Sequence, residues 1–406
     1  MSDGTSGSAA GKCDNVLLLG AGFSRAAGVP LMADFVERMW EYAARGMSNG
    51  KPLSPEDVEI LARAKEVWTE LDSFHGRAEF DDRNIEDILS LLSFNVLAGE
   101  TGSQENLEGI NKAISRTIEL ACTTKHPGLP KTVPYTPVDD GPPEYRTFWT
   151  LLLERLRNGS ALPAIITTNY DLVLERSLFQ VLMNTIFTPR SNRLPFEHVK
   201  LCFHNSVIDD PTYDVQYVAY THWEPPHRED GTILKRSATS AKAIQEIELL
   251  KLHGSLSFPK QRLENGATSE PVSAQRDPDI LPPIFNKLST GNVEGIWRTA
   301  LNRLRTAKNV VVVGYSLPRT DIYMQYFLKA ALGPNRDLNR ISFFDPMFWQ
   351  DGAESSDMEQ RYRACFSPQV QKRLLFRPRY VGDPDGQGTL SHFLSVLASQ
   401  PELILF

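Results

Sequence analysis

A glycine-rich segment directly follows a short apolar run near the start of the chain. Val16 to Leu19 lead into Gly20 to Ser24 and then into Gly28-Val29-Pro30. Glycine has no Cβ, so a diphosphate could approach this backbone, and a helix beginning after the turn would offer amide groups and the positive end of its dipole. The spacing G-x-G-x5-G differs from the dehydrogenase G-x-G-x2-G. A nucleotide site and a simple tight turn are both open interpretations of this segment.

Polar or glycine residues also follow four later apolar runs. The runs are Ala164 to Ile166 before Thr167-Thr168-Asn169, Leu249 to Leu252 before His253-Gly254, Val310 to Val313 before Gly314, and Ile341 to Phe344 before Asp345. Continuous apolar runs of this length are typical of strands buried on both faces of a parallel sheet. Ligands bind such sheets outside the carboxyl ends of the strands, so the five clusters predict one shared site.

The interval between the first two predicted strands, residues 31–163, is too long for a single crossover helix. Its apolar spacing is helical at Val58 to Leu71, at Ile85 to Val96 and at Phe148 to Leu156. We therefore predict an α/β fold in which a Rossmann-like doubly wound parallel sheet carries a largely helical insertion.

Four segments resemble, in order, the motifs of the sirtuin superfamily. Gly20 to Pro30 resembles its phosphate loop, and Thr167 to Asp171 resembles its T-Q-N-x-D with Thr168 in place of Gln. Leu252-His253-Gly254 resembles its catalytic H-G, and Gly314-Tyr315-Ser316 resembles its G-T-S. Four ordered matches, each at a predicted strand end, are far more specific than any one of them. They leave the insertion unmatched.

The resemblance implies an NAD-binding Rossmann domain that breaks the bond between nicotinamide and ribose. By matched position, Asn169 and His253 would be the catalytic residues, with Asn169 beside the nicotinamide ribose and His253 the base acting on a ribose hydroxyl. Asp171 would shape that pocket. The remaining NAD contacts would come from Gly20, Ala21, Gly22 and Ser24 at the phosphates, Gly314 and Ser316 at the adenosine half, and Asp345 at the adenine ribose.

These residue types suit that chemistry. Loss of nicotinamide leaves an oxocarbenium-like ribose, so catalysis needs a group that places water and a base that titrates near the working pH. An Asn side chain orients water without acting as an acid, and His titrates in the right range. Structural roles without catalysis stay open for these residues. Asn169 and Ser24 could cap helices, and a His before Gly is often a turn or core residue.

The sequence departs from the protein-deacetylating sirtuins in two places. Their structural zinc module uses two C-x-x-C pairs, whereas Cys13, Cys122, Cys202 and Cys365 lie far apart, so we expect no zinc and no other metal site. Leu31-Met32-Ala33 stands where those enzymes carry Asp-Phe-Arg. What remains resembles divergent bacterial sirtuin-like domains of antiphage defence, which hydrolyse NAD and starve the infected cell.

Three hypotheses of function follow from this resemblance. The first is hydrolysis of NAD to nicotinamide and ADP-ribose, as an NAD-depleting effector of antiphage defence. The second is a module that senses NAD or ADP-ribose without cleaving it, and the third is a zinc-free protein deacylase. Similar chains assemble as rings with HerA-type ATPases, so the resemblance also implies a homo-oligomer and such an ATPase partner.

The predicted organisation has four parts. They are a flexible N-terminus at 1–13, a sirtuin-like Rossmann NAD-binding domain at 14–30 and 164–380, a helical insertion at 31–163, and a C-terminal helix and tail at 381–406. A strand at Arg373 to Phe376 and an amphipathic helix around Leu390 to Leu397 are expected near the end of the chain.

Composition and charge exclude some classes of protein. The chain has 406 residues, a net charge of −7 and 41% hydrophobic residues, which is ordinary for a globular protein with a substantial core. Direct nucleic-acid binding needs a clustered basic surface, so none is expected. No apolar stretch approaches the roughly 18 to 20 residues of a membrane span, and the N-terminus lacks a signal-peptide pattern. We therefore expect a cytoplasmic protein without membrane contact.

Two other motif-like stretches do not fit the context that their chemistry needs. Gly7 to Cys13 is one residue short of a Walker A loop and follows no strand. Gly46 to Gly50 spells the G-x-S-x-G of a serine hydrolase elbow, but it follows a helical pattern where that elbow needs a strand. A loop is the better interpretation of the second stretch.

Overall fold

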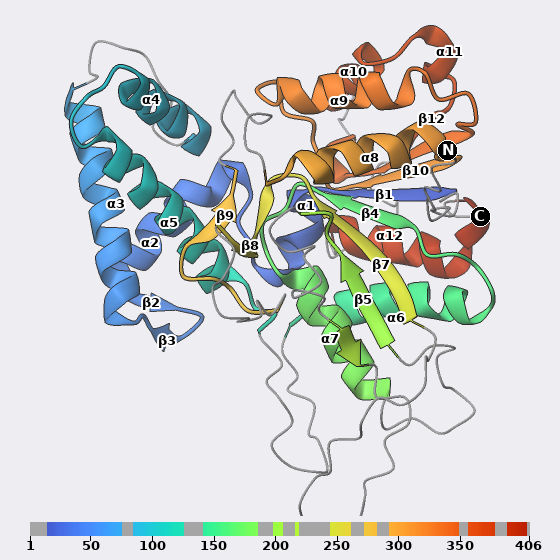
Figure 1. The fold of residues 1–406 in the computed structure, drawn as a ribbon, viewed down its shortest axis with the longest axis horizontal. Coiled ribbons are helices and arrows are strands. Elements are labelled where there is room, and N and C mark those ends of the chain that lie inside the picture. Colours follow the sequence, from blue (N-terminus) through green and yellow to red (C-terminus); the bar gives the residue numbers. More distant parts are fainter. Residues whose placement is uncertain are drawn as a thin grey trace, which may run out of the picture.

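Strand β1 (Asn15–Leu19) lies in the middle of an eight-stranded sheet with the order β12-β11-β10-β1-β4-β7-β5-β6 (Figure 1). Val16 to Leu19 are fully buried. A strand covered on both faces has no polar side, which explains its continuous apolar run. The computed structural model describes residues 14–74, 84–125, 141–185, 198–205, 216–218, 244–260, 272–281, 292–348, 356–377 and 388–403. The expected flexible N-terminus and the Walker-like stretch lie outside these residues.

The other predicted runs also form parallel strands of this sheet. Their bounds are β4 (Ala164–Thr167), β7 (Ile244–Lys251), β10 (Asn309–Val313), β11 (Arg340–Phe344) and β12 (Leu374–Arg377). β5 (His198–Cys202) pairs parallel with β7, and β6 (Gln216–Val218) pairs antiparallel with β5. β7 begins earlier than its apolar run, and its first half includes the adjacent polar residues Gln245 and Glu246.

Helices cover both faces of the sheet, which confirms the predicted doubly wound α/β class (Figure 1). On one side, α12 (Gly388–Ser399) packs on β10 and β11 and on α6 (Pro143–Arg157), which in turn packs on α7 (Val173–Thr185). On the other, α8 (Glu294–Thr306) packs on β7 and on α9 (Ile322–Leu332). The short helices α10 (Asp357–Ala364) and α11 (Pro368–Gln371) precede β12.

The direction in which the chain adds strands reverses at β1. From β1 the chain proceeds to β4, β5 and β7 on one side, and it then returns to β10, β11 and β12 on the other. At such a reversal the loops after the two neighbouring strands diverge, and a crevice forms outside their carboxyl ends. Gly20, after β1, and Gly314, after β10, therefore stand at the switch point of the sheet.

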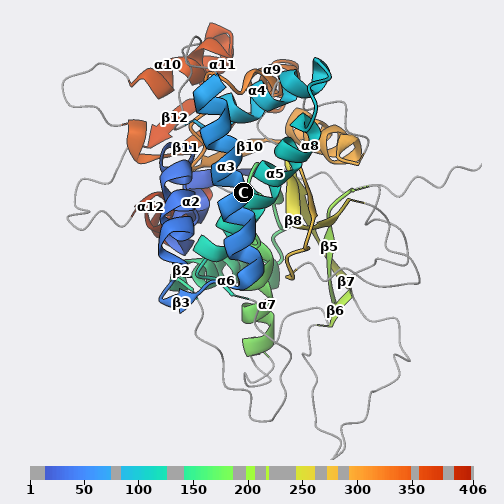
Figure 2. The same ribbon diagram turned by 90° about the vertical axis from the view of Figure 1, so that its left-hand side faces the viewer.

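A helical subdomain lies beside the sheet and faces the viewer in Figure 2. It contains α2 (Phe35–Arg45), α3 (Pro55–Phe74), α4 (Ile85–Leu97) and α5 (Ser103–Ala121), and α5 packs against the other three. The sequence analysis missed α5, although its buried Ile110, Ile114 and Ile118 recur at helical spacing. The domain boundaries themselves stay a prediction.

The G-x-S-x-G stretch forms a hairpin and not a nucleophile elbow. Its short strands are β2 (Met47–Ser48) and β3 (Lys51–Pro52), joined through Asn49 and Gly50, which both have positive φ. The Ser48 hydroxyl donates to the Leu120 carbonyl at 2.6 Å. A loop was expected over this stretch, and the structure instead places the short strand β2 within it.

Candidate functional site

The glycine-rich segment forms a tight turn that is packed against the end of β10. The amides of Gly20 and Gly22 donate to the carbonyls of Val313 and Gly314 at 3.0 and 2.9 Å. A Cβ on Gly20 would lie 2.5 Å from the Gly314 oxygen, and one on Gly314 would lie 2.5 Å from the Gly22 carbonyl carbon. These positions must be glycine because the two backbones are in direct contact. The Gly22 amide already donates to Gly314, so it is not available to a phosphate.

The helix expected after this turn is present but has only one turn. Helix α1 spans only Ala21–Ser24, and a 3-10 turn over Arg25–Ala27 follows, ending at Gly28 with φ 81°. A macrodipole requires several aligned peptide units, so one helical turn contributes little to phosphate binding. The turn is instead fixed from outside, because the buried Tyr145 hydroxyl donates to the Phe23 carbonyl at 2.8 Å and accepts from the Ala27 amide at 3.1 Å.

Asn169 connects the end of β4 to the glycine-rich turn. Its side-chain nitrogen donates to the Gly20 carbonyl and to Ser24 Oγ, both at 2.9 Å. Its backbone amide donates to Thr167 Oγ1 at 3.1 Å, and Thr167 Oγ1 in turn donates to the Leu19 carbonyl. The glycine-rich turn thus holds the Asn169 side chain at two points, while Thr167 holds its backbone, and the residue retains 9% exposure.

Neither Asn169 nor Ser24 caps the helical segment that follows it. Asp171 Oδ1 accepts from the Val173 amide at 3.1 Å at the start of α7, so the cap is Asp171 and not Asn169. Ser24 precedes the 3-10 turn, but its side chain makes no capping hydrogen bond there and instead accepts from Asn169.

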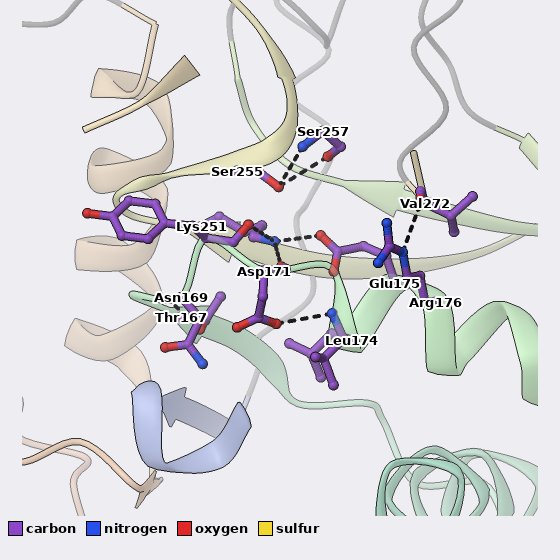
Figure 3. Close-up of polar contacts among 12 residues, drawn as sticks. Thr167, Asn169, Asp171, Leu174, Glu175, Arg176, Lys251, Ser255, Ser257 and Val272 are labelled. Atoms are coloured by element: carbon purple, nitrogen blue, oxygen red, sulfur yellow. Dashed lines mark hydrogen bonds and ion pairs between the residues drawn. The ribbon is translucent and has the colours of Figure 1, made fainter. Parts of the chain in front are cut away.

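A buried ion pair lies directly beneath the turn that carries Asn169 and Asp171 (Figure 3). Lys251, the last residue of β7, places its Nζ 2.7 Å from Glu175 Oε1 and 2.5 Å from the Asp171 carbonyl oxygen. Burial raises the pKa of Glu175, while the Lys251 ammonium opposes that shift. Lys251 was not among the residues expected at the site, because it belongs to no motif.

His253 follows β7 and lies between two aromatic rings. Its ring centroid is 6.1 Å from that of Tyr170 and 6.2 Å from that of Trp297. Trp297 is itself fixed, because its indole donates to the Leu252 carbonyl at 2.9 Å. The imidazole is 6% exposed, so its ring is held in one orientation with a small opening to solvent.

The strand pair β8 (Gly254–Pro259) and β9 (Pro278–Ile280) holds the His-Gly turn from above. The Leu281 amide donates to the His253 carbonyl at 2.7 Å, and the Tyr170 hydroxyl donates to the Leu281 carbonyl at 2.6 Å. Gly254 has φ 83°, and a Cβ there would meet the Asp279 carbonyl oxygen at 2.2 Å. Only glycine fits beneath this segment.

The structure brings Asn169 and His253 to the same edge of the sheet, on neighbouring strands. Thr167 and Lys251 are paired across β4 and β7, and each candidate residue lies two positions beyond its strand's paired residue. The Tyr170 ring, next to Asn169 in the chain, reaches the His253 ring. The two candidate residues therefore follow adjacent strand ends.

The ends of β10 and β11 form the other half of the site. The Gly314 amide donates to the Phe344 carbonyl at 2.9 Å, which joins the two strand ends. Asp345 follows directly, and its Oδ1 accepts from the Met347 amide at 2.9 Å. Burial raises the pKa of Asp345. The Ser316 carbonyl accepts from Arg361, and its partly exposed side chain lies beside this pair of strand ends.

The helical subdomain reaches the same region through α4. Glu86 Oε2 accepts from the Thr320 hydroxyl at 2.5 Å, just before α9 begins. The pKa of Tyr170 is raised by burial, with smaller contributions from Glu86 and Asp321. A surface hollow of about 350 Å³ lined by Glu56, Arg276 and their neighbours lies elsewhere, contains none of the candidate residues and carries an exposed ion pair.

Comparison with known proteins identifies one family. Residues 163–364 match the family model described as SIR2-like domain. This match supports a sirtuin-like family for the chain. The matched residues, called here the SIR2-like region, include Asn169, His253, Gly314 and Asp345 but not the glycine-rich turn. A SIR2-like domain is usually an NAD-dependent enzyme, which suggests a protein that uses NAD.

Other comparisons add little to this assignment. A solved structure from work on the mechanism and regulation of Sir2 enzymes aligns with 94% of this chain and 88% of its own, at 12% identity and a TM-score of 0.33. This TM-score is too low to establish a shared fold, and the fold is instead defined by the chain's own strand order. The search of curated proteins gave no significant match.

The described residues contain neither a membrane-spanning helix nor a cluster of metal-binding side chains. No helix in the described ranges is both long and apolar enough to cross a membrane. Among the same residues, His, Cys, Asp and Glu side chains nowhere gather in threes as a metal site would require.

Proposed function

We propose that the chain binds NAD across the carboxyl ends of β1, β4, β7, β10 and β11 and hydrolyses it to nicotinamide and ADP-ribose. The observation that carries the proposal is the placement of Asn169, anchored on the glycine-rich turn, beside His253 on the next strand. The SIR2-like region, which contains both residues, supports NAD as the substrate.

The hydrogen bonds of Asn169 indicate which of its atoms would act. Both hydrogens of its side-chain nitrogen are engaged by Gly20 and Ser24. The side-chain oxygen is therefore the atom that can accept a hydrogen bond from a water molecule or a ribose hydroxyl. A flipped amide would turn its oxygen toward the Gly20 carbonyl, so the side chain would present that acceptor in one direction.

His253 would act as the general base. A water molecule oriented by Asn169 would bond to the ribose carbon, its proton passing through a ribose hydroxyl to the imidazole, and nicotinamide would leave with the electrons of the broken carbon–nitrogen bond. The packing against Tyr170 and Trp297 would keep the imidazole plane fixed during this step. A positioned base contributes about 10²- to 10⁴-fold in rate.

The remaining candidate residues fit an extended dinucleotide at the same edge. The Asp345 carboxylate at the end of β11, whose Oδ1 accepts from the Met347 amide, would bind hydroxyl groups of a ribose. Ser24 and Asp171 would act mainly through the protein, since both side chains are buried and bonded to other parts of the site. Gly20, Ala21, Gly22, Gly314 and Ser316 would bring the backbone close to the phosphates and the adenosine.

The test is mass spectrometry of NAD incubated with the purified chain. We expect nicotinamide and ADP-ribose from the wild type and at least a hundredfold slower release from Asn169→Ala and His253→Ala. Ser48→Ala is a matched control, because Ser48 is also a buried serine with a backbone acceptor but lies in the β2–β3 hairpin. Wild-type rates in both site variants would contradict the assignment. Release that requires an acylated peptide would indicate a deacylase instead.

One observation favours a second function, the sensing of NAD without cleavage. Asn169 and His253 are only 9% and 6% exposed, so the site is nearly closed. A nearly closed site is consistent with a protein that binds NAD without cleaving it. It is also consistent with a hydrolase that is activated by a conformational change. Calorimetric binding of NAD without nicotinamide release under any condition would favour sensing.

We also propose that the protein serves antiphage defence by depleting NAD, as a homo-oligomer with a HerA-type ATPase partner. This part rests on the resemblance of the motifs to such defence proteins. Cellular NAD measured after phage infection, with wild-type and His253→Ala chains, tests the defence role. Light scattering with and without the neighbouring ATPase tests the assembly, and a monomer in both conditions would refute it.

A further inference from the structure

Lys251 and Glu175 are charged side chains buried in the core beneath the candidate site. Their side chains are 1% and 0% exposed, and Nζ and Oε1 are 2.7 Å apart (Figure 3). Removing two charges from water costs several kcal/mol, which mutual attraction offsets only when the geometry is good. A pair of apolar residues would fill the same space at similar stability, so the ion pair calls for another explanation.

The other contacts of Lys251 all go to one turn. Its Nζ donates to the Asp171 carbonyl at 2.5 Å and lies 3.5 Å from the Tyr170 carbonyl. With Glu175, these acceptors match the three hydrogens of an ammonium group. Tyr170 and Asp171 directly follow Asn169, so the lysine grips the backbone next to the candidate catalytic amide.

Lys251 also lies two residues before His253 on the same strand end. One side chain therefore ties the turn after β4 to the end of β7, and these are the two segments that carry Asn169 and His253. A shift of about 1 Å between two such groups can lower a rate by about a hundredfold.

We propose that Lys251 is a positioning residue, which holds the Tyr170 and Asp171 carbonyls with its ammonium group so that Asn169 keeps a fixed place relative to His253. Glu175 is the buried carboxyl group that pairs with this ammonium group at 2.7 Å. The catalytic consequence rests on the proposed function, whereas the fixing of the turn is a property of the chain alone.

The test replaces the whole pair by Lys251→Met with Glu175→Leu, which leaves no orphaned charge in the core. The matched control is Arg303→Met with Glu248→Leu. That ion pair also includes a β7 residue, with 2.5 Å between Arg303 and Glu248, but it does not contact the turn. Both double variants and the wild type are compared by hydrogen exchange of residues 168–174 and by nicotinamide release from NAD.

The proposal predicts faster exchange at residues 168–174 and about a tenfold to hundredfold lower kcat in the Lys251/Glu175 variant, with a folded core. The Arg303/Glu248 variant should match the wild type in both measurements. If the Lys251/Glu175 variant exchanges and turns over like the wild type, the pair only supports the fold and the proposal is overturned.

Two further outcomes are separable. A wild type that releases no nicotinamide contradicts the proposed function, and the exchange data alone then decide the role of Lys251. If the first variant does not fold, Lys251→Gln with Glu175→Gln takes its place. The two glutamines can hydrogen-bond to each other, but the glutamine at position 251 would be too short to reach the Tyr170 and Asp171 carbonyls. Faster exchange at residues 168–174 and a lower kcat are therefore expected again.

Discussion

Asn169 donates from its side-chain nitrogen to Ser24 Oγ at 2.9 Å, and this bond joins segments 145 positions apart in the chain. The acceptor is a buried hydroxyl on the one-turn helix α1, and the donor follows the neighbouring strand β4. The bond therefore helps to fix the orientation of the candidate catalytic amide.

Ser24→Ala removes this acceptor and leaves one Asn169 hydrogen without its partner. We expect a loss of about 1 to 3 kcal/mol in the free energy of unfolding. We also expect about a tenfold lower kcat, because the amide can then rotate. Urea unfolding and nicotinamide release measure the two effects. Ser48→Ala, with a similar buried bond, should lose stability but not rate, and equal rate losses in both would argue against a specific role for Ser24.

Gly314→Ala tests the contact between the ends of β1 and β10. Gly314 has φ 64°, and its Cβ would lie 2.5 Å from both the Gly22 carbonyl carbon and the Phe23 nitrogen. Strain and crowding together should cost about 3 kcal/mol or more. Gly99→Ala is the control, because Gly99 has φ 76° but nothing within 4 Å of its Cβ, and it should cost about 1 kcal/mol. Equal urea midpoints for the two variants would contradict the packing argument.

Arg176→Met tests how the segment over His253 is held. The buried guanidinium donates to the Val272 and Thr124 carbonyls at 2.9 and 3.0 Å and to Glu119 at 2.9 Å. Its loss should destabilise the fold by about 3 kcal/mol and speed hydrogen exchange at 272–281. The exposed Arg276–Glu56 pair is the control, and Arg276→Ala should cost under about 1 kcal/mol. Unchanged exchange at 272–281 would show that Arg176 does not hold this segment.

Glu248 predicts a specific dependence of stability on pH. Burial raises its pKa, but His204 and the bonds from Arg303 outweigh burial and bring the pKa to about 2 from an ordinary 4.5. Because the pKa is lower in the folded state, this stabilisation is present above pH 4.5 and is lost as the pH falls toward 2. Glu248→Gln should therefore be less stable than the wild type at pH 7, with the gap narrowing below pH 4.5. A gap that stays constant down to pH 3 would contradict the lowered pKa.

The strands at the centre of the sheet could be predicted from sequence because burial on both faces leaves a continuous apolar run. β1, β4 and β10 are such runs, and the polar residues after them were correctly expected at strand ends. Helix α5 was missed although its isoleucines have helical spacing, because polar residues dominate the rest of that segment.

The contacts within the site were less predictable, since they depend on partners far apart in sequence. Lys251 meets Glu175 76 positions away, and neither residue belongs to a motif. The glycines were expected to leave room for a ligand. Instead, the backbone of Gly22 packs directly against the backbone of Gly314. A local pattern shows where a backbone must lack a side chain, but it does not show what approaches that backbone.

The position of β1 has a consequence for any shortened form of this protein. The family match begins at residue 163, whereas β1 is formed by Asn15–Leu19 and pairs with β4 on one side and β10 on the other. A fragment limited to the matched segment would be a sheet without its middle strand. Two apolar edges would then face water or each other out of register, and such a fragment should precipitate unless residues 14–30 are supplied with it.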